Sequence, residues 1–452
     1  MSNDHNDGFS RRQFLQLSAS FGVLATLGNL DWASAATPDD YKALVCVFLF
    51  GGNDGHNTIV PLDQVQYDAY AAARGGLALA RNTLLPVDDA QGPFGFHPLM
   101  PQTQDLYRTG RAAVVANVGM LVGPTGWSDL GDPSKLPANL RSHSDQVIQM
   151  QSGSPAGAAS SGWGGRAADS VASFNATAAF PVSVSLSGSA LFCAGNSVPA
   201  ASLQPGNILS QSAMSLWPQS AADARAAAQR QVVTQTSGNQ LVNAANKQLA
   251  GGIDLHPLLK QAQSSITWNR PFPTTGLGRQ LADIARIISL HSQLGVGRQV
   301  FFASLGGFDT HGTQSWNQGV LLQEVDNAVR AFYDATDQLG LAQSVTTFTL
   351  SDFGRTLQPS GSGSDHGWGN HHLVVGGAVQ GSRIYGQFPL MTNYANLNAT
   401  AEDYADTRGV LLPRQSLSQY GATLARWFGA DPNTTFANLG NFGTATDLGF
   451  MG

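Results

Sequence analysis

The chain has little charge and almost no cysteine among its 452 residues. Its two cysteines, Cys46 and Cys193, are too few for a disulfide framework, so we expect a packed core to hold the fold. Cys46 lies inside an apolar run and is expected to be a buried thiol, with a single bridge to Cys193 left open. With 24 Lys and Arg, no basic run and a net charge of −6, the composition argues against nucleic acid or an anionic membrane as partner.

Motifs of several enzyme classes are also absent. There is no G-x-S-x-G, which argues against the nucleophile elbow of α/β-hydrolases. Walker A and H-E-x-x-H are missing as well, which removes support for a P-loop NTPase or a zincin.

The N-terminus has the features of an export signal. Arg11 and Arg12 precede an apolar run, and residues 33–35 read Ala-Ser-Ala. This order predicts a twin-arginine signal peptide at 1–35, and a mature chain of 36–452 that the twin-arginine translocase exports already folded. We therefore expect a periplasmic or secreted protein. No other run has the ~18 apolar residues that would predict a membrane span in the mature chain.

Continuous apolar segments alternate with helical patterns along the mature chain. Strands are expected near 41–50, 111–119, 181–187, 298–307, 344–351 and 372–379, and helices near 141–151, 278–293, 314–340 and 416–429. Ser142 or Ser144 can cap the first of these helices. The pattern predicts one α/β domain, a doubly wound and mostly parallel sheet with helices on both faces.

Two segments fall outside that pattern. Residues 223–250 are rich in Ala, Gln and Asn, which predicts a helical insertion around 210–275. The Gly/Ser stretch from Pro359 to Ser364 is expected to be a loop.

Polar clusters follow three of the expected strands, at 51–58, 306–314 and 351–356. Since ligands bind outside the carboxyl ends of open α/β sheets, we expect Asp54, Asp309, His311 and Asp352 at one rim. Carboxylates mixed with imidazoles, without thiolates, are typical of a Zn, Mn or Fe hydrolytic site. Turns alone would also enrich strand ends in Asp, Asn and Gly.

The motifs in combination resemble a known family. They are "FLFGGNDGHNT", "RSHSD", "GGFDTHGTQ", "SDFGRT", "SDHGWGNHH" and "DTRGVLLPRQSLSQYGATLARWFG". They resemble the DUF1501 family, which is similar to the alkaline phosphatase/sulfatase superfamily. The resemblance implies an alkaline phosphatase-like fold and a centre of one or two divalent ions, Zn or Mn.

Carried over by position, the resemblance implies a set of site residues. The implied metal ligands are Asp54, Asp309, His311, Asp352, Asp365, His366 and His371, with His372 as an alternative to the last. The implied catalytic residues are Ser142 as nucleophile, with Ser144 as its alternative, Arg355 as the oxyanion group, and His143. Phe353 departs from the superfamily pattern, because it stands where a histidine ligand is expected and cannot bind a metal.

Two functions follow from this resemblance. The first is an exported metal-dependent hydrolase of phosphate or sulfate esters, acting on a small molecule or a glycan. A formylglycine sulfatase is disfavoured, because Cys193 is followed by "AGNS" rather than by the Cys-x-Pro-x-Arg motif. The second is a non-catalytic surface or secretion-assembly protein that keeps the fold with at most one metal, and Phe353 favours it.

Overall fold

The computed structural model describes residues 40–178, 180–206, 217–239, 266–395 and 402–452, with a few positions between 240 and 265. The expected signal peptide lies outside the described residues, as does much of the expected insertion. Within that insertion, Gln219–Val233 (α7) is helical as predicted. Cys46 and Cys193 are both buried and free, and burial raises the pKa of Cys193 to about 12.

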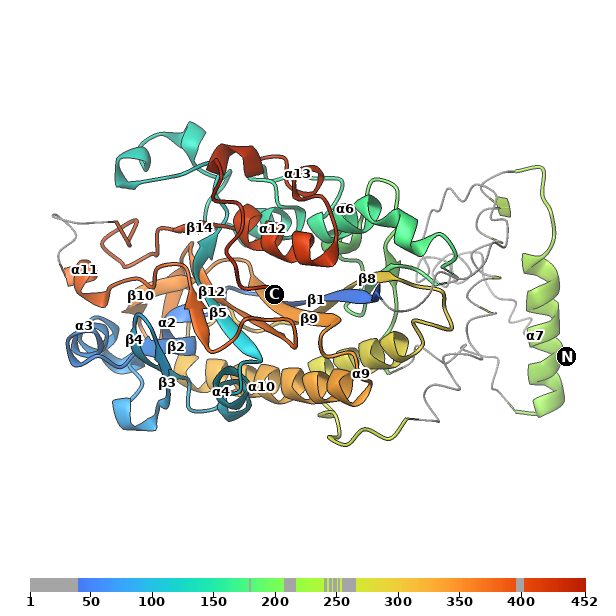
Figure 1. The fold of residues 1–452 in the computed structure, drawn as a ribbon, viewed down its shortest axis with the longest axis horizontal. Coiled ribbons are helices and arrows are strands. Elements are labelled where there is room, and N and C mark those ends of the chain that lie inside the picture. Colours follow the sequence, from blue (N-terminus) through green and yellow to red (C-terminus); the bar gives the residue numbers. More distant parts are fainter. Residues whose placement is uncertain are drawn as a thin grey trace, which may run out of the picture.

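A mostly parallel sheet forms the centre of the described part of the chain (Figure 1). In spatial order its strands are β13 (Arg383–Tyr385), β5 (Ala112–Gly119), β12 (Asn370–Gly376), β9 (Val345–Ser351), β1 (Lys42–Leu49), β8 (Arg298–Leu305), β6 (Ser183–Ser185) and β7 (Ala201–Ser202), and β14 (Gln415–Ser416) also pairs with β5. Neighbours are parallel except at β12, which is antiparallel to β5 and β9. The prediction of a mixed α/β fold with a mostly parallel sheet is confirmed.

Helices cover both faces of this sheet (Figure 1). One face carries α4 (Pro101–Arg108), α9 (Gly276–Ser289) and α10 (Gln314–Gln338), and α3 (Gln64–Arg74) packs beside the sheet against residues 355–360 and 391–395. The other carries α5 (His143–Ser152), α6 (Trp163–Ser170), α12 (Leu417–Phe428) and α13 (Pro432–Thr435).

Strand β1 shows why the sheet is buried on both sides. Val45 and Val47 belong to the core under α9 and α10, whereas Cys46 and Phe48 belong to the core under α6 and α12. Successive side chains of a strand point to opposite faces, so a continuous apolar run satisfies two helical layers at once.

Smaller elements surround the sheet. They are α2 (Gly55–Thr58), α11 (Met391–Ala395), a three-stranded sheet of β2 (Ile59–Pro61), β4 (Gly92–Phe96) and β3 (Leu85–Asp89), and a hairpin of β10 (Arg355–Ser360) and β11 (Gly363–His366). Short 3₁₀ segments are η2 (Gly75–Leu77), η3 (Arg81–Thr83), η4 (Trp127–Asp129), η5 (Pro133–Lys135), η6 (Ala172–Asn175), η7 (Leu191–Cys193) and η8 (Leu439–Phe442). Within the described ranges, no helix has both the length and the hydropathy to cross a membrane.

The Gly/Ser stretch at 359–364 differs from its prediction as a loop. Both ends of the stretch are strand, and Pro359 pairs with Ser364 across a tight turn in which Gly361 has φ +62°. The same hairpin places His366 opposite Arg355. A glycine that accepts the left-handed turn allows the chain to return at once to the point where β10 began.

Candidate metal centre

The parallel strands β8 and β9 end at one edge of the sheet and deliver residues to a common place. The loop after β8 carries Asp309 and His311, and the loop after β9 carries Asp352. The β10–β11 hairpin returns His366 to this edge, and the first residue of α5 supplies His143. Ser142 is the N-cap residue of α5, as predicted, so His143 begins the helix.

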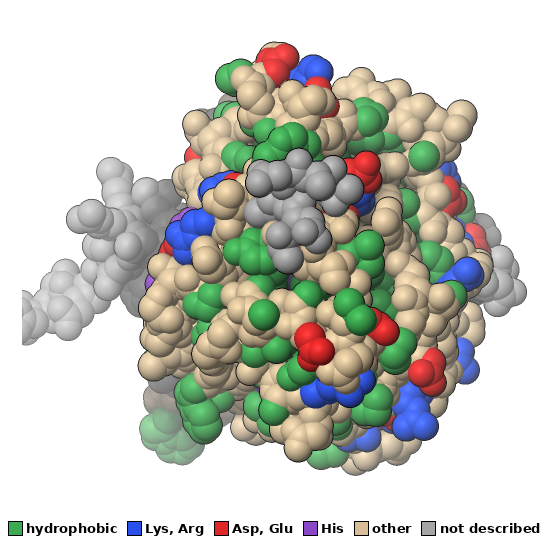
Figure 2. Space-filling model, turned by 90° about the vertical axis from the view of Figure 1, so that its left-hand side faces the viewer, with side chains coloured by type: hydrophobic (Ala, Val, Ile, Leu, Met, Phe, Trp, Pro, Cys, Tyr) green, Lys and Arg blue, Asp and Glu red, His purple; other side chains and the backbone are tan. Residues whose placement is uncertain are grey.

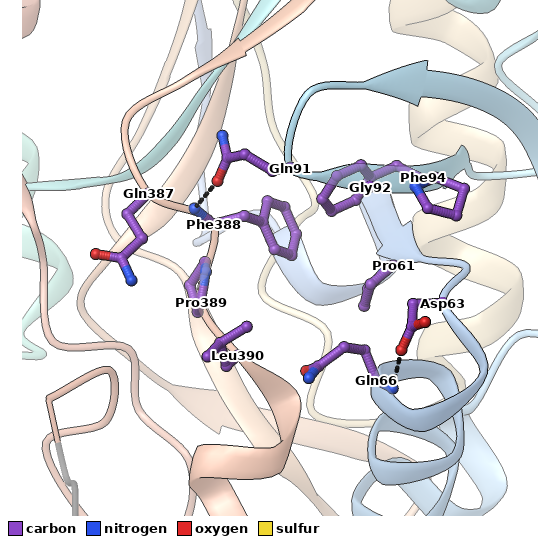
Figure 3. Close-up of a pocket in the computed structure, with 11 residues that line it drawn as sticks. Pro61, Asp63, Gln66, Gln91, Gly92, Phe94, Gln387, Phe388, Pro389 and Leu390 are labelled. Atoms are coloured by element: carbon purple, nitrogen blue, oxygen red, sulfur yellow. Dashed lines mark hydrogen bonds between the residues drawn. The ribbon is translucent and has the colours of Figure 1, made fainter.

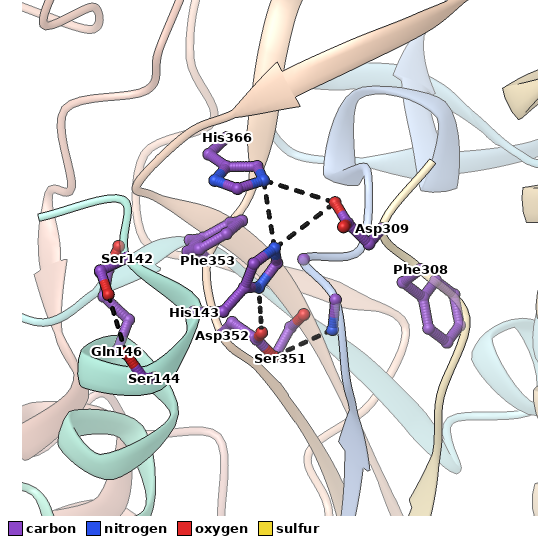
Figure 4. Close-up of polar contacts among 12 residues, drawn as sticks. Ser142, His143, Ser144, Gln146, Phe308, Asp309, Ser351, Asp352, Phe353 and His366 are labelled. Atoms are coloured by element: carbon purple, nitrogen blue, oxygen red, sulfur yellow. Dashed lines mark hydrogen bonds and ion pairs between the residues drawn. The ribbon is translucent and has the colours of Figure 1, made fainter. Parts of the chain in front are cut away.

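Four donor atoms from these segments meet. The Nε2 atoms of His143 and His311 lie 3.1 Å and 3.0 Å from Nε2 of His366. Oδ1 of Asp309 lies 3.4 Å, 3.0 Å and 3.4 Å from Nε2 of His143, His311 and His366, respectively. Figure 4 shows His143, His366 and Asp309 directed toward one another. We call these four side chains the rim cluster.

The other ring nitrogen of each histidine faces an oxygen. Nδ1 of His143 lies 2.7 Å from Oδ2 of Asp352, whose other oxygen accepts the backbone N–H of Gly51 at 3.1 Å. Nδ1 of His366 lies 2.9 Å from the backbone oxygen of Arg141. Nδ1 of His311 lies 3.3 Å from Oδ1 of Asp365.

These oxygens determine the tautomers of the rings. A carboxylate or a carbonyl can only accept, so each Nδ1 carries the proton and each neutral ring keeps a lone pair at Nε2. Three such lone pairs then face one another and a carboxylate oxygen, an arrangement that repels unless a cation or protons lie between them. Carboxylate or carbonyl partners on the far nitrogen are typical of metal-binding histidines.

The spacing of the donor atoms fits a single small cation. Ligand atoms about 2.0–2.1 Å from a tetrahedral zinc ion lie about 3.3–3.4 Å apart. The separations between donor atoms within the rim cluster run from 3.0 to 3.4 Å. His143, Asp309 and His366 therefore could hold a metal ion together. His311 is a further donor on their exposed side.

Charge and burial act differently on the members of the rim cluster. The hydrogen bond to Asp352 raises the pKa of His143, whereas burial lowers the pKa of His366. Partial burial acts to raise the pKa of Asp309, but the hydrogen bond and charge of Arg355 outweigh it and the pKa is lowered. Asp309 thus stays ionised and available as an anionic donor.

Arg355 is buried, and oxygen acceptors take four of its five N–H groups. Its guanidinium donates to the carbonyl oxygens of Gly51 at 2.8 Å and Gly52 at 2.9 Å, to Ser364, and to the carboxylate of Asp309. The predicted role as an oxyanion group stays a prediction, although these acceptors use most of its N–H groups. In the structure Arg355 fixes the glycine-rich end of β1 and orients Asp309.

Phe353 packs directly against the rim cluster. Its ring centroid lies 4.7 Å from that of His143 and 4.8 Å from that of His366. The residue that breaks the superfamily pattern therefore serves as an apolar wall behind two donor rings (Figure 4).

Three of the expected metal ligands lie elsewhere. Asp54 is buried in an ion pair with Arg74 of α3 and accepts the N–H of His56 at 3.0 Å, so its charge is already balanced. His371 and its alternative His372 are buried in the interior, stacked on Phe388 and on Tyr420. They follow Asn370 on β12, whose antiparallel direction carries both into the sheet.

Two expected ligands are outer partners instead. Asp352 and Asp365 contact the far nitrogens of His143 and His311, on the side of each ring that faces away from the shared centre. His143, expected to be catalytic, is itself one of the four donors. Its position directly after a helix cap could have identified it as a donor from the sequence, because the first turn of α5 projects its side chain toward the sheet edge.

The expected serine nucleophile does not point at the rim cluster. Oγ of Ser142 donates to Asp145 at 2.6 Å and lies 3.1 Å from Oγ of Ser144. Figure 4 shows Ser142 and Ser144 at the start of α5, directed away from the His143 ring. A local acceptor within the same helical turn binds this hydroxyl, and the structure does not bring Ser142 to the rim cluster.

A small apolar pocket lies apart from the rim cluster (Figure 3). It encloses about 150 Å³ between the β2–β4 strands and residues 387–390. Gln91 accepts the N–H of Phe388 at 2.9 Å, and Asp63 accepts that of Gln66 at 3.2 Å. Its polar side chains hold the local backbone, so the pocket offers packing rather than chemistry.

The rim cluster is open to solvent. The side chains of Asp309 and His311 are 47% and 46% exposed, and those of His143 and His366 are 33% and 27% exposed. On the face drawn in Figure 2, histidine side chains lie at one edge beside basic and acidic ones. Solvent can therefore reach the donors in this conformation.

Comparison with known proteins gives a family. No curated protein matches the chain. The family described as "Protein of unknown function (DUF1501)" matches residues 41–431, which include every residue of the rim cluster. The chain belongs to the DUF1501 family.

Proposed function

We propose that the chain is an exported, metal-dependent hydrolase of phosphate or sulfate esters with an alkaline phosphatase-like fold. One observation carries the proposal: three Nε2 atoms and one carboxylate oxygen face one another, while each far nitrogen faces an oxygen acceptor. Imidazole and carboxylate donors without thiolate suit zinc or manganese at a hydrolytic site.

His143, Asp309 and His366 would hold one divalent ion. Three protein ligands are typical of catalytic zinc, whereas four are typical of structural zinc. When bound, the ion supplies Lewis acidity toward the ester group. A second ion has no support, because Asp352 is engaged with His143 and Phe353 fills the neighbouring position.

His311 is the residue placed to move a proton. Its Nε2 lies 3.0 Å from Asp309 and its Nδ1 faces Asp365, so the neutral ring offers a lone pair on the exposed side of the rim cluster. A water that attacks the ester loses a proton to Nε2 of His311, and Asp365 stabilises the resulting imidazolium. The leaving alkoxide can then accept that proton from His311. Water therefore replaces the serine nucleophile, since Ser142 points elsewhere.

A second candidate function follows from the same residue. If His311 binds the ion as a fourth ligand, the donor set is complete, as in structural zinc sites. The chain would then be a non-catalytic surface or secretion-assembly protein with one metal. The short distances from His311 Nε2 to both His366 and Asp309 are the observation that favours it.

One variant separates the two functions. The metal content of purified wild type and His311→Asn is measured, together with turnover of nitrophenyl phosphate, the bis-nitrophenyl diester and nitrophenyl sulfate. For the hydrolase we expect the variant to keep about one ion per chain and to lose turnover by about 100-fold or more. Loss of the ion together with absence of turnover in the wild type would favour the structural role.

A matched control is His291→Ala. That ring packs against Tyr41 near the start of β1, at the opposite end of the strand from the rim cluster. Its removal should leave metal content and turnover unchanged.

A further inference from the structure

The segment Asp403–Leu412 runs beside the β10–β11 hairpin. Leu357 and Gln358 of β10 donate their N–H groups to the backbone oxygens of Gly409 and Arg408, both at 3.0 Å. Oδ1 of Asp406 accepts the N–H groups of Arg408 at 2.9 Å and Val410 at 3.2 Å, and Gly409 has φ +75°. These bonds make 406–409 a fixed turn docked on the hairpin that carries His366.

One side of this turn reaches the outer partner of His366. The second carboxylate oxygen of Asp406 forms an ion pair with Arg141 at 2.7 Å. Arg141 has φ +72°, a conformation that L residues with side chains rarely adopt and that costs free energy. Its backbone oxygen accepts from Nδ1 of His366 in this conformation. The ion pair and the bond from Arg141 N–H to Gln146, at 2.7 Å, hold the acceptor in place.

The other side of the turn reaches the outer partner of His311. The guanidinium of Arg408 forms an ion pair with Oδ2 of Asp365, whose Oδ1 faces Nδ1 of His311. Two charged side chains two residues apart thus hold the outer partners of two different rim histidines. The third, His143, is held by Asp352, which directly follows β9.

We propose that Asp406 and Arg408 are positioning residues that set the metal affinity of the rim cluster through Arg141 and Asp365. This inference rests on the proposed metal site and goes beyond it, because neither residue touches the donors. Outer partners of metal-binding histidines typically change affinity by about 10- to 100-fold when removed. The turn would therefore orient two donor rings at once.

The test is zinc affinity, measured by competition with a chromophoric chelator on the full chain. We expect Arg408→Met and Asp406→Asn each to weaken zinc binding by about 10-fold or more. The matched control is Glu402→Gln, which removes an exposed ion pair with Arg414 in the same part of the chain and should bind zinc like the wild type. Circular dichroism of the metal-free variants checks that they fold.

A double-mutant cycle separates positioning from general destabilisation. If Arg408 acts through Asp365, Arg408→Met should cost little further affinity in an Asp365→Asn background. Equal losses in both backgrounds, or wild-type affinity in both single variants, would overturn the inference while leaving the metal site intact. A wild type that binds no zinc would instead overturn the proposed function, and this inference with it.

Discussion

Six histidines of this chain fall into two regions that use the same side chain in opposite ways. His143, His311 and His366 lie at the open edge of the sheet, with each Nδ1 facing an oxygen and each Nε2 facing a common centre. His56, His371 and His372 stand in the polar motifs "FLFGGNDGHNT" and "SDHGWGNHH", but their side chains are fully buried. Burial lowers the pKa of His56 and of His372 to about 3 and also lowers that of His371.

The difference teaches that a partner on the far nitrogen identifies a ligand better than sequence proximity does. His371 and His372 stand within six residues of His366, yet among the described residues the Nε2 atoms of both lack a hydrogen-bond partner and their rings stack on aromatic side chains. Packing holds both rings, and Nδ1 of His371 accepts the N–H of Asn117 at 3.1 Å instead of donating to an oxygen. The rim histidines are held by oxygen acceptors that leave a lone pair free for an ion.

The largest expected effect separates the regions by metal binding. His366→Ala removes a donor from the rim cluster, so we expect zinc affinity to fall by at least about 100-fold, more than the loss of an outer partner causes. The thermal midpoint of the metal-free protein should change little, because the ring is partly exposed. Calorimetric titration with zinc measures the first and circular dichroism the second. Undiminished binding would remove His366 from the site.

The opposite result is expected for the buried region, where a substitution should lower stability and leave zinc affinity unchanged. His372→Ala leaves a cavity beside Tyr420, for which we expect a loss of about 2–4 kcal/mol in the free energy of unfolding. Zinc affinity should stay within about twofold, since His372 has no contact with the rim cluster. Urea denaturation of the metal-free variant measures the loss. A large fall in zinc affinity without a change in stability would erase the distinction between the regions.

Acid should act through the buried region. The folded-state pKa values of His56 and His372, about 3, lie below the ordinary value of about 6.5 in the unfolded chain. As the pH falls below about 6.5, the unfolded chain binds protons that the folded chain does not, so each group lowers stability by about 1.4 kcal/mol per pH unit. His372→Leu removes the contribution of one histidine, so the stability of the variant should fall less steeply with decreasing pH. Urea denaturation of the metal-free protein between pH 6.5 and pH 5 measures this. If the slope of stability against pH is unchanged in His372→Leu, the lowered folded-state pKa of His372 is contradicted.

The smallest expected effect is at the boundary of the rim cluster. Asp352 raises the pKa of His143 by accepting its Nδ1 proton, so Asp352→Asn should lower that pKa. Protons and metal compete for Nε2, and the loss of a carboxylate partner should still weaken zinc binding by about 10-fold. Nuclear magnetic resonance titration of the metal-free protein follows the pKa. If the pKa of His143 stays raised in the variant, another group is its cause.

Much of the fold could be predicted from continuous apolar runs. β1, β5 and β9 are buried along nearly their whole length, and this burial on two faces is what such runs indicate. The direction of β12 could not be predicted, because a buried strand has the same composition whether it is parallel or antiparallel. Because β12 runs in this direction, the side chains of His371 and His372 lie in the interior and not at the rim cluster.

The candidate site could be predicted in part for the same reason. Asp309 and His311 follow the end of β8, which the local sequence indicates, whereas the hairpin that returns His366 was predicted as a loop. Asp54 was misassigned because its partner, Arg74, is an isolated arginine in a helix, and nothing local shows that it folds back into the interior. Asp406 and Arg408 belong to the motif "DTRGVLLPRQSLSQYGATLARWFG". No role could be predicted for them, because their contacts join segments far apart in the sequence.

X-ray absorption at the zinc edge of the zinc-loaded protein tests the central claim most directly. We expect about one ion per chain, a shell of nitrogen and oxygen only at about 2.0–2.1 Å, and the outer-shell scattering of at least two imidazoles. His366→Ala should lose part of that imidazole scattering, while His372→Ala should keep all of it. Absence of bound zinc, or a shell without imidazole scattering, would contradict the account.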